Sequence, residues 1–201
     1  MNEEAKLAYR ESLKWKSEVE RVFKEIIGHD KFTITDSDKI QDTQEATDFI
    51  LHNADLEQSV GFRTLEESKM IDFPTITFRY MSNGKITEWN KIDIHPDLYL
   101  WGYGDIHAPT KQINQYILVN MTKFRAKNFK DRVRRRPDKY VFGNKDNTTS
   151  LVSIKWKELC EYIPNTDPCV MASNIPEVEK LVKREYAEAV RIERMKIALG
   201  T

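Results

Sequence analysis

Cysteine is scarce in this sequence, which holds only Cys160 and Cys169 among its 201 residues. Two cysteines cannot make a disulfide framework, and their spacing is too wide for a metal site without histidine partners. Four histidines, none of them in a paired spacing such as H-x-x-x-H, make a structural zinc site improbable on the same grounds. We therefore expect both cysteines to be free thiols in a reducing compartment, which favours a cytoplasmic protein.

Long apolar runs and glycine-rich loops are absent too. No stretch reaches the ~18 apolar residues that a membrane-spanning helix needs. The start of the chain, MNEEAKLAYRESLKWK, carries charge from residue 3 onward and does not resemble a signal peptide. No glycine-rich phosphate loop and no G-x-S-x-G elbow is present. These features disfavour a membrane protein, a P-loop enzyme and an α/β-hydrolase.

Charge is abundant and balanced, with 32 basic and 32 acidic residues. A zero formal net charge disfavours a protein that is basic throughout and coats DNA. It leaves open a local basic groove, because a partner responds to the local field rather than to the sum.

Hydrophobic periodicity predicts an α/β (α+β) fold. Helical spacing covers residues 3–27, and a period of two then predicts strands at 47–52, 58–64, 74–81, 86–94, 97–104 and 113–120. The turn Ser82-Asn83-Gly84-Lys85 predicts that 74–81 and 86–94 pair as a hairpin. Further on, we expect a helix at 121–132, a loop at 141–149, a strand at 151–154, and helices at 157–163 and 176–198. Together these elements predict a single mixed sheet with flanking helices in residues 1–163, then a linker and a long C-terminal helix in 164–201.

The strands at 47–52 and 58–64 suggest a phosphodiester site. Asp48 opens the apolar run Phe49-Ile50-Leu51, and a carboxylate there can hold a divalent cation; the alternative is an Asp that caps the preceding loop. Arg63 ends the next strand and can bind a phosphate, although it is a poor proton donor or acceptor. Gly61 stands where a second metal-binding carboxylate would be expected.

A second carboxylate must therefore come from elsewhere, or the site binds nucleic acid without cutting it. Glu88 is one candidate, together with Lys91, although at a spacing of three in a strand the two point to opposite faces. Glu18 and Glu25 at the edge of the first helix are the other candidates. The alternative for each of these residues is a solvated surface position.

Basic residues concentrate between positions 123 and 139, where only two acidic residues interrupt them. Aromatic residues are interleaved, so the segment is a candidate phosphate-contacting surface. A solvated helix face and a surface for an acidic protein partner are the alternatives. The candidate nucleic-acid-binding residues are Lys123, Arg125, Lys127, Lys130, Arg132, Arg134, Arg135 and Arg136.

Several blocks in order give the chain a wider resemblance. They include Ala46-Thr47-Asp48, the strand ending in Arg63, Thr75 to Arg79, Ser82 to Glu88, Asp97 to Tyr103 and Ile117 to Arg125. Over about residues 40–160 this order resembles divergent PD-(D/E)xK nuclease-like proteins of phages and mobile elements. The resemblance implies a DNA-acting fold that uses Mg²⁺ or Mn²⁺. Only Asp48 carries over from the motif, since the acidic position falls on Gly61 and the lysine on Arg63.

The hypothesis is therefore a cytoplasmic nucleic-acid-binding protein with a nuclease-like core. If it hydrolyses DNA, Asp48, Arg63, Glu88 and Lys91 would form the catalytic set, and Asp48 with Glu25 or Glu18 would hold the metal. The alternative is a non-catalytic, phage-encoded protein that binds and modulates a host nucleic-acid or defence machine.

Overall fold

The computed structural model describes residues 14–29, 31–38, 47–53, 56–70, 74–82, 85–86, 88–143, 148–161 and 168–199, and gives the backbone alone for residues 69, 82, 85, 86 and 188–199. The first part of the predicted helix, residues 3–13, and the turn residues Asn83-Gly84 lie outside this description.

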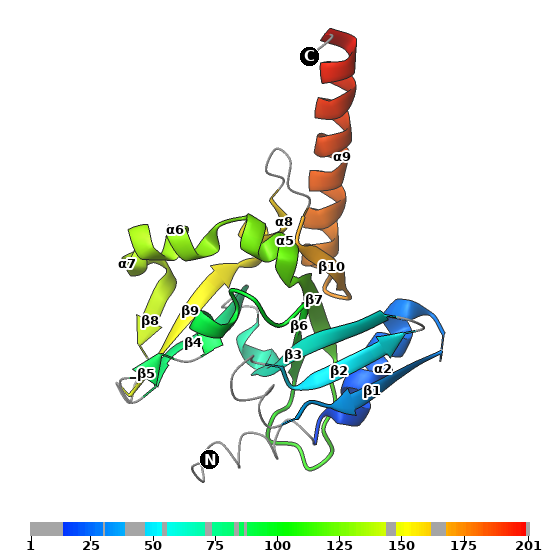
Figure 1. Ribbon diagram of the computed structural model, residues 1–201, viewed down its shortest axis with the longest axis vertical. Helices are drawn as coiled ribbons and strands as arrows, with labels where there is room; N and C mark the ends of the chain where they lie inside the picture. The colour runs from blue at the N-terminus through cyan, green and yellow to red at the C-terminus, as the bar shows by residue number, and fades with distance from the viewer. Residues whose placement is uncertain are drawn as a thin grey trace.

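A mixed sheet of six strands forms the centre of the molecule (Figure 1). In spatial order it contains β1 (Phe32–Asp36), β2 (Phe49–Asn53), β3 (Leu56–Glu66), β6 (Leu98–Gly104), β7 (Gln115–Asn120) and β10 (Val170–Ser173). β3 and β6 run parallel, and every other neighbouring pair is antiparallel. The predicted strands at 47–52, 58–64, 97–104 and 113–120 all lie in this sheet, whereas β1 and β10 were not predicted.

A second, antiparallel sheet contradicts the expectation of a single sheet. Its order is β5 (Lys85–Ile86), β4 (Thr75–Ser82), β9 (Thr149–Lys155) and β8 (Val141–Gly143). The predicted hairpin between β4 and the next strand is confirmed, but that partner strand is only two residues long. The rest of the predicted strand 86–94 is wrong, because α4 (Glu88–Lys91) replaces it.

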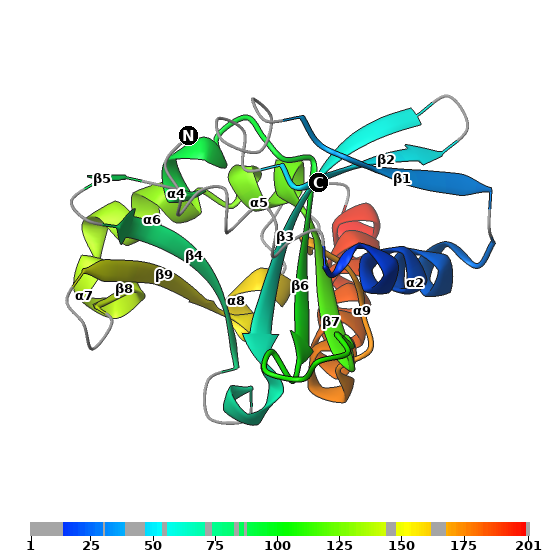
Figure 2. The same cartoon turned by 90° about the horizontal axis from the view of Figure 1, so that it is seen from below.

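The two sheets are joined by aromatic side chains of β6. The indole of Trp101 donates a hydrogen bond to the carbonyl of Thr77 at 3.1 Å, and the hydroxyl of Tyr103 donates to the carbonyl of Thr75 at 3.1 Å. A large apolar core fills the space between the sheets, with Phe78 packed edge-on against Trp101 at 5.1 Å between ring centroids. Figure 2 shows β4 and β9 beside the central strands β3, β6 and β7.

Helices cover both faces of the central sheet. α2 (Lys16–Ile27) buries Val19, Val22 and Phe23 against one face, and Gly28 ends it with a positive φ of 77° that glycine adopts without strain. The opposite face carries the core shared with the second sheet. The helices on that side are α5 (Met121–Ala126), α6 (Phe129–Arg135), α7 (Pro137–Tyr140), α8 (Trp156–Cys160) and α9 (Pro176–Leu199).

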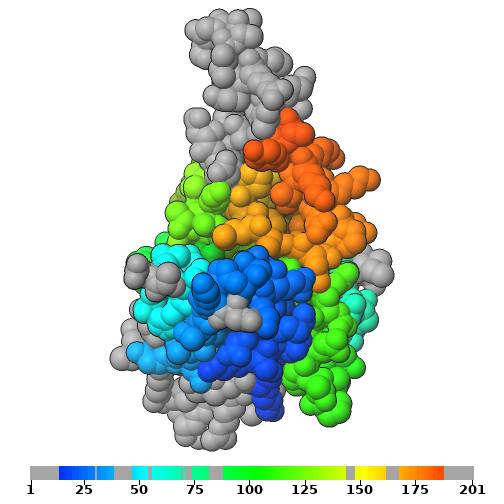
Figure 3. Space-filling view, turned by 90° about the vertical axis from the view of Figure 1, so that its right-hand side faces the viewer, coloured from blue at the N-terminus to red at the C-terminus, as the bar shows by residue number. Residues whose placement is uncertain are grey.

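α9 matches the predicted C-terminal helix closely. Its first turns belong to the body, since Val178 is fully buried and Leu181 and Val182 pack against the same core. Further along, the helix extends away from the rest of the protein (Figure 1), and its orange surface rises above the blue surface of α2 and β1 (Figure 3). Within the described part of the chain, no helix has both the length and the apolarity to cross a membrane.

Candidate functional site

Asp48 lies directly before β2, at the position that the sequence predicts. Its backbone N–H donates to the carbonyl of Val60 at 2.9 Å, and its carboxylate accepts a hydrogen bond from the N–H of Phe62 at 2.8 Å. The side chain thereby extends the ladder between β2 and β3 by one step past the pair Phe49–Val60. This contact across to β3 is neither the metal binding nor the loop cap that the sequence suggests, and the loop 42–45 lies outside the described residues.

Strand alternation places Asp48 and Arg63 on the same face of the central sheet. Phe49, Val60 and Phe62 belong to the core under α2. Because side chains alternate along a strand, Asp48, Gly61 and Arg63 lie on the opposite face, toward the second sheet. Asp48 and Arg63 therefore share one face of the central sheet, as the predicted phosphodiester site requires.

Arg63 forms an ion pair with Glu88, a residue from the first turn of α4. The Nη1 of Arg63 lies 2.9 Å from Oε2 of Glu88, and their side chains are only 20% and 16% exposed. The same Oε2 accepts the backbone N–H of Arg79 at 2.7 Å, and Oε1 accepts the hydroxyl of the buried Tyr99. We call Arg63, Glu88 and Tyr99 the Glu88 cluster; it connects β3, β4, β6 and α4.

Gly61 lies next to this cluster in the sheet. It pairs with Tyr99 across the parallel strands β3 and β6. Tyr99 stacks on Trp101 at 4.1 Å between ring centroids and directs its hydroxyl to Glu88. At the position where the resemblance expects an acid, the sheet thus presents bare backbone between Asp48 on β2 and Tyr99 on β6.

The sequence predicts both Arg63 and Glu88 as site residues, but it places Glu88 in a strand and not in a helix. Residues 88 and 91 lie three apart in a helical turn, so they share one side of α4 instead of pointing to opposite faces of a strand. The sequence reasoning missed Tyr99. Its position in the strand pattern 97–104 suggested core, and nothing in the sequence indicates that its hydroxyl meets Glu88.

Glu18 and Glu25 lie on the other face of the sheet. Glu18 accepts the N–H of Ile113 at 2.9 Å, and Glu25 accepts the hydroxyl of Tyr116 at 3.1 Å. Burial, reinforced by the Glu25 carboxylate, raises the pKa of Tyr116 to about 12. The structure therefore does not bring either glutamate to the face of Asp48; both hold the β6–β7 region against α2.

The arrangement does not fit a resident divalent metal ion. Among the described residues, no three His, Cys, Asp or Glu side chains are grouped so that they could hold one. Asp48 accepts a backbone N–H, and the Glu88 carboxylate accepts three donors, which occupies most of its lone pairs. The predicted Mg²⁺ or Mn²⁺ site thus lacks the shared carboxylates that it requires.

The basic segment is divided between structural and exposed cations. Lys127 is 2% exposed and donates to the carbonyls of Leu159 and Glu161, so its predicted contact with nucleic acid is wrong for this conformation. Arg125 donates to the carbonyls of Ile92 and Pro96 at 3.2 Å, and burial lowers its pKa.

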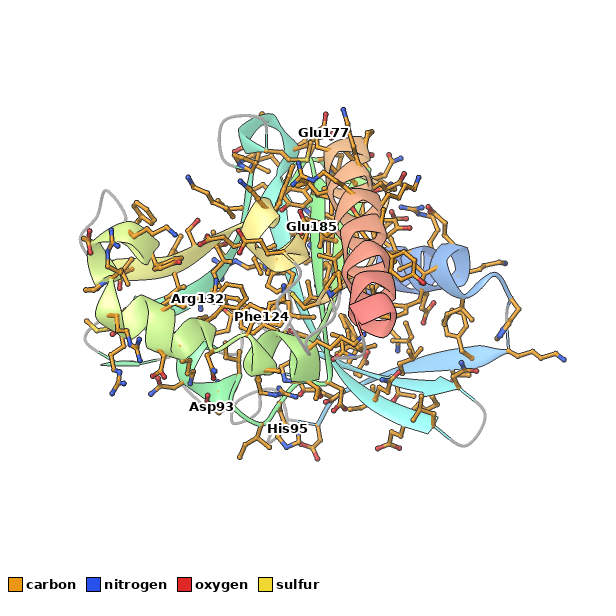
Figure 4. All side chains as sticks on the ribbon, turned by 90° about the horizontal axis from the view of Figure 1, so that it is seen from above. Asp93, His95, Phe124, Arg132, Glu177 and Glu185 are labelled. Carbon is orange, nitrogen blue, oxygen red and sulfur yellow. The ribbon has the colours of Figure 1, made fainter. Side chains whose placement is uncertain are left out.

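The cations further along α6 are more accessible. Arg132 stacks over the ring of Phe129 at 5.0 Å, and Arg134 pairs with Asp131 at 3.0 Å while remaining largely exposed. Arg135 and Arg136 are exposed and make no ion pair with any described residue. Lys123 is half-buried and has a partner of its own. Figure 4 shows side chains with nitrogen tips projecting from α6.

Comparison with known proteins adds no family to these observations. No protein-family model matches the sequence, and a search of curated proteins finds no match either. The nuclease-like interpretation therefore depends on the block order of the sequence and on the geometry described above.

The Glu88 cluster gives a first testable prediction. Replacing Glu88 with alanine removes the acceptor of three hydrogen bonds, and we expect the free energy of unfolding to fall by about 1–3 kcal/mol. Urea denaturation followed by tryptophan fluorescence measures the change. Glu20→Ala is the matched control, because the half-buried Glu20 makes no side-chain hydrogen bond or ion pair with any described residue. A loss of equal size in both variants would argue that helix composition, and not the cluster, determines the effect.

Proposed function

We propose that the protein binds nucleic acid through the phosphate backbone and does not hydrolyse it. The observation that carries this proposal is the run of exposed arginines at the junction of α6 and α7, Arg134 to Arg136. Exposed guanidinium groups bind phosphate through several donors at once. The proposal takes up the predicted partner, DNA, and a cytoplasmic location, which agrees with the two free, buried thiols.

The Glu88 cluster does not supply the groups that cutting a phosphodiester needs. A strand that begins after Asp48 and a neighbouring strand with Gly61 and Arg63 are what the resemblance to PD-(D/E)xK proteins implies. Arginine keeps its proton and is suited to hold a phosphate, whereas water activation needs a proton acceptor or a metal. With Gly61 in the acidic position and Glu88 committed to three donors, neither position supplies a carboxylate for a metal, and the apolar core between the sheets lies against this face.

The segment 90–96 connects this face to the arginines. Lys130 of α6 donates to the carbonyl of Asn90 at 3.3 Å and to the carboxylate of Asp93 at 2.6 Å, and its ammonium lies 6.0 Å from the ring centre of Trp89. α4, which carries Glu88, is therefore fixed directly against α6. A bound duplex that contacts the exposed arginines would pass next to α4.

Replacing Arg135 and Arg136 together with glutamine tests the proposal. We expect the slope of log affinity against log salt concentration to become shallower by about 1.8, since each lost phosphate contact retains about 0.9 counterion on B-DNA. Fluorescence anisotropy with a labelled duplex between 50 and 300 mM salt gives the slope. Lys180→Gln with Lys183→Gln, two exposed cations of α9, is the matched control and should leave the slope unchanged.

Three results would contradict the proposal. An unchanged slope in the arginine variant would remove the arginines from the interface. Cleavage of DNA in Mg²⁺ or Mn²⁺ that Asp48→Ala abolishes would show an enzyme. No binding to DNA at low salt, with a salt-sensitive complex to an acidic protein, would favour the alternative of a non-catalytic interaction protein.

A further inference from the structure

A small cavity opens between the segment after α4 and the junction of α5 and α6. Its volume is about 220 Å³. Ile92, Phe124 and Phe129 lie at its bottom, where these three side chains are only 1–2% exposed. Figure 4 shows Phe124 further inside the molecule and Asp93 at its outer edge.

The walls of the cavity are polar, and hydrogen bonds hold them in place. Asn128 separates α5 from α6 with a left-handed φ of 53°, which turns the chain sharply between the two helices. Arg125 holds the opposite wall through the carbonyls of Ile92 and Pro96, and Lys130 holds it through Asp93. Both cations of the cavity are thus already committed to protein acceptors.

The chemistry of the rim favours a base over a phosphate. Asp93, Asn128 and Asp131 lie at the exposed rim. Asp93 pairs with Lys130 and Asp131 with Arg134 through one oxygen each, and the second oxygen of each carboxylate can accept a hydrogen bond from an exocyclic amine or ring N–H group of a nucleobase. The asparagine amide provides both a donor and an acceptor. The volume is also below the roughly 300–1,000 Å³ of sites for drug-sized ligands, so it suits one ring system.

We propose that this cavity binds the base of one unpaired nucleotide at the end of, or beside, a bound duplex. The inference rests on the proposed nucleic-acid binding and specifies its substrate class. The exposed arginines hold the backbone, and the cavity between the segment after α4 and the junction of α5 and α6 takes an unstacked base, which presents its polar edge to the rim. Such a contact adds affinity that depends little on salt, because it releases no counterions.

The test compares a blunt DNA hairpin with the same hairpin carrying a three-nucleotide single-stranded tail. We expect the tailed hairpin to bind at least about fivefold more tightly, a preference that persists from 50 to 200 mM salt. Asn128→Gly keeps a residue that tolerates the positive φ and removes the amide. Asp131→Asn removes one rim carboxylate, and Asp138→Asn makes the same change outside the cavity. Asn128→Gly and Asp131→Asn should each reduce the preference for the tailed hairpin to about twofold or less, whereas Asp138→Asn should leave that preference unchanged.

The outcomes separate this inference from the proposed function. Salt-dependent binding of both hairpins with equal affinity would overturn the cavity assignment and leave the proposed function standing. A tail preference that survives both cavity variants would also overturn it, because the unpaired base would then bind elsewhere. Failure to bind either hairpin at 50 mM salt would instead refute nucleic-acid binding altogether.

Discussion

Replacing Lys127 with methionine is expected to lower the free energy of unfolding by about 2–4 kcal/mol. The ammonium is buried and donates to the carbonyl of Leu159 at 3.0 Å and to that of Glu161. These carbonyls lie at the C-terminal end of α8, where a cation is favourable and where carbonyls lack helical donors. Methionine keeps the apolar stem but removes the ammonium donor from both carbonyls; the Leu159 carbonyl then keeps only the backbone N–H of Cys169 at 3.4 Å and its thiol at 3.1 Å.

Urea denaturation of the variant measures this loss as a lower midpoint at an unchanged slope. Lys157→Met on the exposed side of α8 is the matched control, and surface changes of this kind stay within about 0.5 kcal/mol. Equal midpoints for wild type and Lys127→Met would show that water or backbone rearrangement satisfies the carbonyls, and that Lys127 is not a structural cation.

Lys127 also shows what could have been inferred from the sequence about the basic segment. It lies three residues after Phe124, and residues at that spacing share a helix face. Because Phe124 faces the core, the helical pattern itself indicates that Lys127 faces inward. The prediction from composition did not distinguish among the cations of the segment. Their positions around the helix do distinguish Lys127 from the exposed Arg135 and Arg136.

The predicted strands that held were those with strong alternation or a continuous apolar run. The strands at 58–64 and 97–104 correspond to β3 and β6; every residue of β6 is buried, and β3 is buried at its centre, from Val60 to Phe62. Short strands were missed: β1 and β10 have five and four residues and contribute few buried side chains. Edge strands of this length depend on their neighbours for stability, which the local sequence does not reveal.

The segment 86–94 failed for a reason that the sequence contains. Trp89 and Ile92 are both buried in the core between the sheets. In a strand, positions 89 and 92 would point to opposite faces, whereas a helical turn places them on one side. The Asn83-Gly84 turn signal favoured a long hairpin, and this preference outweighed the helical spacing of two large apolar residues.

For the candidate site, the sequence indicated which residues come together, but it did not indicate the contacts of Glu88. It placed Asp48 before a strand and Arg63 on the neighbouring strand, and their shared face follows from the register. It also included Glu88, which the structure joins to Arg63. The partners of Glu88 on β4 and β6 depend on how the second sheet packs, and no local pattern encodes that packing.

The two thiols are expected to make the protein unstable at high pH. Burial raises the pKa of Cys160 and of Cys169 from 9.0 to about 12, and the charge of Cys169 contributes to the rise at Cys160. In the unfolded chain both deprotonate near pH 9, so between about pH 9 and 12 the folded state holds up to two more protons. The stabilising contribution of the thiols is therefore complete below pH 9 and is lost as pH rises toward 12.

At full effect, the free energy of unfolding falls by about 2.7 kcal/mol per pH unit, since each proton accounts for about 1.4 kcal/mol. Lys127 has the opposite effect on stability. Burial lowers its pKa, so its buried charge destabilises the folded state at lower pH, and this cost disappears as pH approaches 10.5. Comparison of wild type with Cys160→Ala/Cys169→Ala isolates the thiols, since Lys127 titrates in both proteins.

Urea denaturation at intervals from pH 7 to 11 gives the two stability curves. We expect the variant to be less stable at pH 7, because small cavities replace two sulfur atoms, and to lose stability more slowly above pH 9. The two curves should therefore converge as pH rises. Parallel curves across this range would mean that the folded thiols deprotonate as readily as the unfolded ones, which their complete burial beneath α8 and β10 argues against.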